Sequence, residues 1–461
     1  MVSRREFLRT VSLPVAASLA GCGLFSVDSG TETSTPDADS PTETPGATTP
    51  GNASDASTAT LTPTATLTPT DTPSTGTPGT TAPGPRGTAT PSPTPPGSAT
   101  DSGLAGTAAF TPASGPAASD FGTAVALSEG VALVDSDGES VAVFESGGDG
   151  WRRTATLAPE GDPEAYSYLP LSIALDGDTA FLGGLELGDE GAVAVVERVG
   201  DEWTRRALVA PGASSDEEYY NFGRSVAHDD GTLVVGAVNE PTTMVSYRGH
   251  VFVFEGSGDD WSQVARFGTE PHDLFGRSVA VSGGTLLVGA PAAGEGTEWD
   301  GTVFVYERSG DEWSRKTTLS VEAEDAGFGR QVALDGDTAV VGALEASDRG
   351  RVHVFERTAD GWTERAAFPA LGDADGTEAA GTVSVDGTTA LVGRPRDDGA
   401  GEALRLERTG DGWERTARLV ADRRDAVDRF GAAVALHGES ALVGAPTTDD
   451  DRPGRAYRFD L

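Results

Sequence analysis

The sequence is poor in cysteine, lysine and histidine. Its one cysteine, Cys22, cannot form a disulfide within the chain, and a cysteine-based metal cluster is excluded. Lys316 is the only lysine, so nearly all positive charge comes from arginine. No two of the five histidines have the spacing of metal ligands, and no GxSxG, HExxH or P-loop motif occurs. These absences argue against an enzyme, although a fold can still assemble a catalytic site from distant residues. The histidines are His228, His250, His272, His353 and His437.

Negative charge dominates the composition. The 461 residues carry a formal net charge of -39. Phosphate backbones bind to clustered lysine and arginine, so the charge argues against nucleic acid, and we expect no nucleic-acid partner. Excess aspartate and glutamate keep a protein soluble where salt screens their mutual repulsion. The charge indicates adaptation to high salt, and an ordinary acidic surface is the alternative.

The N-terminus combines two export signals. Arg4 and Arg5 form an arginine pair, and the short apolar run that follows ends at Cys22 in the sequence LAGC. The apolar run is too short to span a bilayer. Residues 1–22 resemble a twin-arginine signal peptide joined to a lipobox. This resemblance implies export of a folded protein, cleavage before Cys22 and attachment of lipid to its thiol, whereas a chance arginine pair with a buried cysteine is the alternative. The only membrane contact expected is this anchor, on the outer face of the cell membrane.

Residues 23–103 are mostly threonine, proline, serine, alanine and glycine. Such a segment buries too little apolar surface to offset its ordering entropy, so we predict a disordered linker. Its proline favours extended conformations, and its composition is that of O-glycosylated stalks. Asn52 begins the sequence NAS, a possible N-glycosylation site.

From residue 104 onward the sequence repeats. Phe-Gly pairs begin at residues 121, 222, 275, 328 and 430, and degenerate copies at 169 and 379 complete seven copies spaced 48 to 53 residues apart. A second marker, tryptophan after an acidic or glycine-rich turn, recurs in phase with the first. Periods in this range indicate propellers or solenoids. The in-phase tryptophans are Trp151, Trp203, Trp261, Trp313, Trp362 and Trp413.

Each copy contains four strand-like runs separated by glycine, aspartate and serine turns, with no helical periodicity. We therefore predict an all-β fold, a seven-bladed β-propeller of four-stranded antiparallel blades over residues 104–461. The last copy ends after its third strand, and an apolar segment at 106–111 precedes the first copy. We expect that segment to complete the last blade, because a closed ring leaves no free sheet edge. The repeated phenylalanine, glycine and tryptophan are predicted to pack between and within blades.

The sequence FGRSVAVSGGTLLVGAP at 275–291 resembles the FG-GAP repeat of integrin α-chain heads and microbial surface proteins. With the twin-arginine lipobox and the acidity, the chain is similar to haloarchaeal lipoproteins. Many integrin-type repeats carry a DxDxDG calcium loop between the first two strands. Here a tight turn such as Asp335 to Asp337 replaces it and offers too few oxygens for calcium. We therefore predict no metal or other cofactor; weak calcium binding by acidic loops is the alternative.

Function is expected where the copies differ, in the long loops on one face. Aromatic residues are concentrated in the loops of blades two to four, and such side chains are enriched in protein interfaces and stack on sugars. We predict a binding patch for a surface protein or glycan, and local loop packing is the alternative. The predicted patch consists of Tyr166, Tyr168, Tyr219, Tyr220, Tyr247, Arg248 and Trp299.

The sequence thus predicts a monomeric, lipid-anchored, non-catalytic binding or adhesion module on the cell surface. A secreted propeller enzyme that acts on carbohydrate and a structural envelope protein without a ligand are the alternatives.

Overall fold

The computed structural model describes the propeller part of the chain, apart from several connecting segments. The described residues are 103–112, 119–136, 140–157, 172–185, 191–212, 221–238, 249–268, 274–293, 301–321, 327–343, 350–369, 382–396, 401–410, 412–421, 429–447 and 452–461. Their regular structure is entirely β-strand, and none of them forms a helix that could cross a membrane. Cys22, Asn52 and the rest of the predicted signal peptide and linker lie outside the described residues.

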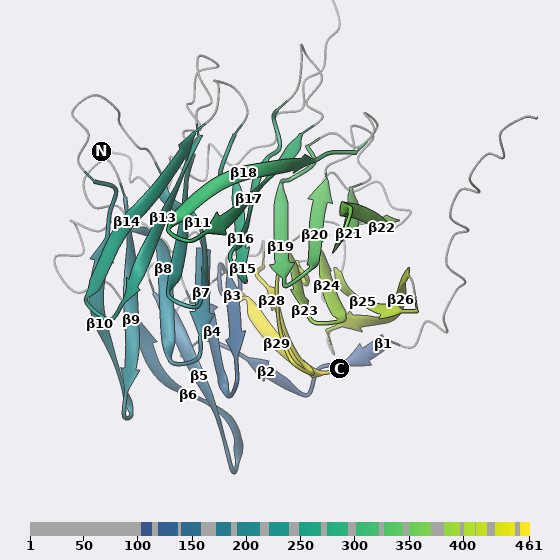
Figure 1. Cartoon of the computed structure of the whole chain (residues 1–461). Coiled ribbons are helices and arrows are strands. Elements are labelled where there is room, and N and C mark those ends of the chain that lie inside the picture. The colour runs from purple at the N-terminus through teal and green to yellow at the C-terminus, as the bar shows by residue number, and fades with distance from the viewer. Residues whose placement is uncertain are drawn as a thin grey trace, which may run out of the picture. The chain divides into compact units, whose positions relative to one another are not determined.

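The first three blades follow the predicted order of four strands each (Figure 1). Blade one comprises β3 (Val125–Ser128), β4 (Val131–Asp135), β5 (Val141–Gly147) and β6 (Gly150–Leu157). Blade two comprises β7 (Ser172–Asp176), β8 (Thr179–Leu185), β9 (Ala192–Val199) and β10 (Glu202–Val209). Blade three comprises β11 (Phe222–Asp229), β12 (Thr232–Val238), β13 (Gly249–Ser257) and β14 (Asp260–Gly268).

The next three blades repeat this order. Blade four comprises β15 (Ser278–Ser282), β16 (Thr285–Ala290), β17 (Thr302–Ser309) and β18 (Glu312–Leu319). Blade five comprises β19 (Gln331–Asp335), β20 (Thr338–Ala343), β21 (Arg351–Thr358) and β22 (Gly361–Pro369). Blade six comprises β23 (Val383–Asp386), β24 (Thr389–Arg394), β25 (Glu402–Thr409) and β26 (Gly412–Val420).

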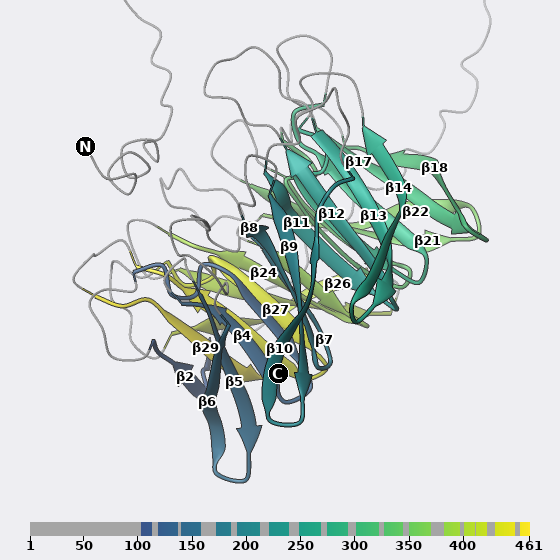
Figure 2. The ribbon, with the colours of Figure 1, turned by 90° about the vertical axis from the view of Figure 1, so that its left-hand side faces the viewer.

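Blade seven joins the two ends of the propeller. It comprises β27 (Ala433–His437), β28 (Ser440–Ala445), β29 (Arg455–Asp460) and, from the N-terminal side, β2 (Ala108–Phe110). β2 pairs antiparallel with β29, and Figure 2 shows the two strands together beside β5 and β6 of blade one. The first strands of consecutive blades contact one another around the whole circle, including β27 with β3. The predicted seven-bladed ring, with its closure by the N-terminal segment, is confirmed.

One strand was not predicted. β1 (Gly103–Ala105) pairs in parallel with β26, so blade six has a fifth strand at its outer edge. Leu104 of β1 packs against the apolar cluster between blades six and seven. Phe110 of β2 stacks on Phe144 of blade one, with ring centroids 4.4 Å apart. Residues 103–110 therefore connect blades six, seven and one.

The burial of each strand follows its place in a blade. β16, with the sequence TLLVGA, is buried along its whole length because both of its faces contact neighbouring blades. Strands of this kind are continuous apolar runs. The outer strand β6, with the sequence GWRRTATL, alternates between exposed and partly buried side chains. The change from continuous to alternating apolar pattern within one repeat therefore reflects the change from inner to outer strand.

The hydrophobic core is divided among the interfaces between blades. One apolar cluster lies at each of the seven interfaces formed by the described residues. Six of these clusters contain an in-phase tryptophan, which packs between its own blade and the preceding one. The indole of Trp413 also donates a hydrogen bond to Glu356 of blade five, at 3.1 Å. The predicted structural role of these tryptophans is confirmed, and the structure places them between blades.

The repeated glycines meet across the interfaces. A Cβ atom added to Gly289 of blade four would lie 2.0 Å from the carbonyl oxygen of Gly329 in blade five. Gly289 belongs to the sequence VGAP, and Gly329 follows Phe328 in the next Phe-Gly pair. The Ser278 hydroxyl donates a hydrogen bond to the same Gly329 oxygen at 2.9 Å. The two halves of the repeated motif are therefore in backbone contact between adjacent blades, where a side chain does not fit.

Candidate functional site on the loop face

The two faces of the propeller differ in how their strands are joined. On one face, which we call the turn face, β15 and β16 are connected by Gly283 and Gly284 alone. Long connections such as 239–248 and 294–300 leave the strand ends of the opposite face, which we call the loop face. Variable loops on a rigid scaffold are the usual location of binding residues. The loop face is therefore the first place to look for a site.

All seven residues of the predicted binding patch belong to these long connections. Tyr166, Tyr168, Tyr219, Tyr220, Tyr247, Arg248 and Trp299 all lie outside the described residues. The strand ends that hold these connections are described, and they show which connections begin and end close together.

Three of the connections are joined at blades two and three. The side-chain amide of Asn221 donates a hydrogen bond to the Val238 carbonyl at 3.0 Å. Asn221 directly follows the connection with Tyr219 and Tyr220, and Val238 directly precedes the connection with Tyr247. The Ser172 hydroxyl, at the end of the connection with Tyr166 and Tyr168, donates to the Gly223 carbonyl at 3.0 Å. Six residues of the predicted patch, all except Trp299, thus belong to segments that are anchored within a few residues of Asn221.

The connection of blade four is closed at its base. The Gly301 amide donates a hydrogen bond to the Ala293 carbonyl at 2.8 Å, which joins the two ends of the segment that contains Trp299. Gly301 has a φ of +77°, and a Cβ atom there would lie 2.2 Å from the Phe328 carbonyl oxygen. Gly249, next to Arg248, approaches the backbone of Phe275 even more closely. The chain therefore enters and leaves these connections at fixed positions.

The described residues show no cluster of metal-ligating side chains. None of them forms a group of three or more histidine, cysteine, aspartate or glutamate side chains that could hold a metal ion. The predicted tight turns between first and second strands are confirmed, for example Asp335 to Thr338. His228 is 8% exposed and stacks on Phe181, with ring centroids 4.3 Å apart, near Asp176 of blade two. Burial lowers the pKa of His228, while Asp176, Asp229 and Asp230 oppose that shift. We assign this histidine to blade packing.

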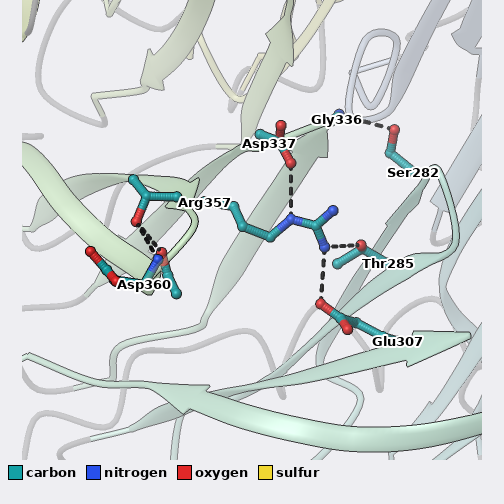
Figure 3. Close-up of polar contacts among 9 residues, drawn as sticks. Ser282, Thr285, Glu307, Gly336, Asp337, Arg357 and Asp360 are labelled. Carbon is teal, nitrogen blue, oxygen red and sulfur yellow. Dashed lines mark hydrogen bonds and ion pairs between the residues drawn. The ribbon is translucent and has the colours of Figure 1, made fainter.

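The turn face carries a regular set of polar contacts between blades. Arg357 of blade five donates to Asp337 in its own blade at 2.9 Å, and to Glu307 and Thr285 of blade four at 2.9 and 3.2 Å (Figure 3). Nearby, the Gly336 amide of blade five donates to the Ser282 hydroxyl of blade four at 3.1 Å. Similar arginine–glutamate pairs connect three other interfaces: Arg198 with Glu145, Arg308 with Glu255, and Arg408 with Glu356. We call these four pairs the arginine–glutamate belt. The belt fixes adjacent blades to each other on the face opposite the variable loops.

One known repeat family matches parts of the sequence, and the bounds of the matched segments fit the strand order of the blades. Three segments of the sequence, residues 261–306, 314–355 and 413–459, match the FG-GAP repeat. Over these segments the chain is similar to FG-GAP repeats. Each matched segment starts in the outer strand of one blade and ends in the third strand of the next, as from β14 to β17. The FG-GAP repeat is thus offset from the blade by one strand, which is why the last blade needs a strand from the N-terminus.

Solved structures with a similar chain path include Sqt1 of Saccharomyces cerevisiae. It is 11% identical, with a TM-score of 0.43, and the match covers 78% of this chain and 100% of Sqt1. A second match comes from a structural and mechanistic study of two prolyl endopeptidases. It is 13% identical, with a TM-score of 0.42, and covers 70% of this chain and 45% of that one. No curated protein matches the sequence.

Proposed function

We propose that this FG-GAP propeller is a non-catalytic binding or adhesion module, held on the outer face of the cell membrane by a lipid on Cys22. The ligand is a surface protein or a glycan, and it binds to the loop face at blades two to four. The observation that carries this proposal is the hydrogen bond from Asn221 to Val238, at 3.0 Å. It places the origins of two tyrosine-bearing connections side by side on a rigid ring.

The proposal rests on a division between scaffold and loops. The glycine contacts, the interface clusters and the arginine–glutamate belt account for the residues that repeat. The aromatic residues of the loop connections do not repeat, so packing between blades does not require them. Tyrosine and tryptophan supply large contact areas at little cost in conformational entropy, which makes them frequent binding hot spots. Rigid anchors at both ends of a loop reduce the entropy lost on binding further.

The binding test uses the exported chain with Cys22→Ser, which removes the proposed anchor. We expect this protein to bind cell-envelope preparations, and the combined substitution of Tyr220, Tyr247 and Trp299 by alanine to abolish that binding. The control replaces three exposed acidic residues where outer strands begin on the turn face, Glu202, Asp260 and Glu312, by alanine. Retained binding by the aromatic triple variant, with native circular dichroism, would refute the assigned patch. Protease and periodate treatment of the envelope distinguish a protein ligand from a glycan.

The anchor has a separate test. Metabolic labelling with a lipid precursor is expected to mark the native chain and to be absent from the Cys22→Ser variant, which should leave the membrane fraction. Unchanged membrane fractionation of this variant would contradict the lipid anchor and leave the binding patch unaffected.

A further inference from the structure

Blade six departs from the other blades at the loop-face end of its second strand. In blades three, four, five and seven this strand ends in a buried alanine: Ala237, Ala290, Ala343 and Ala445. In blade six the corresponding residue is Arg394, with a side chain that is only 7% exposed. A guanidinium group has replaced a methyl group at a site where burial of an uncompensated charge is costly.

Arg394 belongs to a cluster formed by three strands of blade six. Its Nη1 atom lies 2.6 Å from Oε1 of Glu402, the residue opposite it on β25. The second oxygen of Glu402, Oε2, accepts a hydrogen bond from Nη1 of Arg418 on β26 at 3.2 Å. The Nε atom of Arg394 is buried and has no hydrogen-bond partner among the residues that the structure describes. The Glu402 carboxylate thus pairs with two guanidinium groups, and within the described part of the chain the Nε–H group of Arg394 lacks an acceptor.

Further positive charge lies near Arg394. Burial lowers the pKa of Arg394, and the positive charges of Arg415, Arg396 and Arg418 lower it further, while Glu402 raises it. Arginine does not lose its proton in proteins, so the group stays charged and the missing interaction is an anion. This concentration of positive charge lies within a chain whose formal net charge is -39.

The cluster also lies at an unusual interface. Val392, two residues before Arg394 and on the same side of the sheet, packs against Val352 and Phe368 of blade five. On the blade-five side, a Cβ atom added to Gly342 would meet no described atom closer than 3.4 Å, whereas the same atom on Gly289 would meet one at 2.0 Å. The sequence has two alanines, at 379 and 380, where other blades have Phe-Gly. Among the described residues, the close backbone contact made by Gly183, Gly236, Gly289, Gly393 and Gly444 with the next blade has no counterpart at Gly342.

We propose that the loop-face end of the interface between blades five and six is a binding site for a small monovalent anion, held by Arg394 and Arg418 beside Glu402. The planar N–H fork of arginine suits a carboxylate, and the same N–H groups also bind a halide. The anion is therefore either free chloride from a salt-rich medium or the carboxylate of a ligand. This site is separate from the aromatic patch of blades two to four, and it does not depend on the function proposed for that patch.

The test measures broadening of the ³⁵Cl NMR line by the purified chain at fixed ionic strength. The decisive variant is Arg394→Ala with Glu402→Thr, which installs the alanine and threonine found at the same positions in blade four, Ala290 and Thr302. We expect the protein-dependent broadening to be lost in this double variant. It should persist in Arg357→Ala, which removes an arginine from the turn face. Equal broadening in wild type and double variant would overturn the proposal.

A second variant covers the case in which the double variant does not fold. Glu402→Gln removes the carboxylate that competes for Arg394 and Arg418 and keeps its shape. We expect chloride to bind this variant more tightly than it binds wild type, whereas weaker or unchanged binding would overturn the proposal. Added acetate distinguishes the two anions. Acetate that narrows the chloride line shows that the site accepts carboxylates, and acetate without effect shows a halide site.

Discussion

The contact between glycines of adjacent blades gives the sharpest prediction for stability. In Gly289→Ala the new methyl group would lie 2.0 Å from the Gly329 oxygen and 2.4 Å from the Ser278 hydroxyl. The first atom is backbone and cannot move unless blade five shifts. Overpacking of this kind costs about 1–3 kcal/mol. Displacement of Ser278 also removes its hydrogen bond to Gly329, which contributes about 1 kcal/mol. We expect the free energy of unfolding to fall by about 3 kcal/mol.

Gly342→Ala is the matched control, because it makes the same substitution at the same position of the next blade. Among the described residues its methyl group would meet the Gln331 side chain and backbone, at 3.4 Å or more. Glycine in a strand costs about 0.5–1 kcal/mol relative to alanine through its entropy in the unfolded chain. We therefore expect Gly342→Ala to be neutral or slightly stabilising.

Urea unfolding followed by tryptophan fluorescence suits this comparison, because the in-phase tryptophans lie at the interfaces. The free energies of unfolding of the two variants should differ by about 3 kcal/mol, with Gly289→Ala below wild type and Gly342→Ala equal to wild type or slightly above it. Equal shifts in both variants would show that the close glycine contact does not determine which side chains the interface tolerates. Full stability of Gly289→Ala would refute the reasoning outright.

Three further predictions follow from single side chains. Burial lowers the pKa of His228 and favours its neutral form in the native state, so stability should be lost as pH falls from about 6.5 through the folded-state pKa. The free energy of unfolding, measured against pH, should fall less in His228→Phe than in wild type. An equal fall in both proteins would contradict the assignment of His228 to blade packing. Phe110 is 3% exposed in the strand that closes the ring, so Phe110→Ala should lower the free energy of unfolding by about 3–5 kcal/mol. The variant should also be cleaved in its N-terminal segment by limited proteolysis, and resistance equal to wild type would count against the role of Phe110 in closure. Leu274 has a φ of 55°, a left-handed conformation that costs leucine about 1 kcal/mol and that asparagine adopts more readily. Leu274→Asn should therefore raise the free energy of unfolding by about 1 kcal/mol in a urea titration. A loss of stability would show that packing of the leucine side chain outweighs its backbone strain.

Most of the fold could be predicted because two markers repeat in phase. The phenylalanine-glycine pair and the tryptophan each have a physical role that every blade needs, so their spacing counts the blades. The closing strand was predictable for a different reason. The last copy lacks an outer strand, and the apolar segment that includes Phe110 had no other partner. Strand β1 could not be predicted, because parallel pairing of three residues uses backbone groups and leaves no side-chain pattern.

Less of the candidate site than of the fold could be predicted from the sequence. Residue types predicted an aromatic patch, which stays a prediction, and only the structure shows the hydrogen bond from Asn221 to Val238 that joins the ends of two of its segments. The arginine–glutamate belt was visible in part as a recurring Glu-Arg dipeptide, for example Glu307 and Arg308, whose two members contact different neighbouring blades. Partners on other blades cannot be read from one repeat alone. The anion cluster had a direct signal, because Arg394 occupies the alanine position of the repeated motif.

In a repeat protein the copies act as controls for one another, and this makes departures from the repeat informative. The alanine at the end of the second strand is buried in four blades, so the packing of the ring requires only a small side chain there. Arg394 therefore cannot be explained by what the ring needs, and the cost of its burial has to be offset locally. Glu402 offsets part of that cost and shares its carboxylate with Arg418. The same argument assigns the glycines, tryptophans and belt arginines to the scaffold, since each recurs at equivalent positions of several blades. What remains unexplained by repetition, the aromatic connections and the buried arginine, is confined to the loop face. The scaffold residues can therefore be tested by stability and the loop-face residues by binding, and a substitution that alters one measurement should leave the other unchanged.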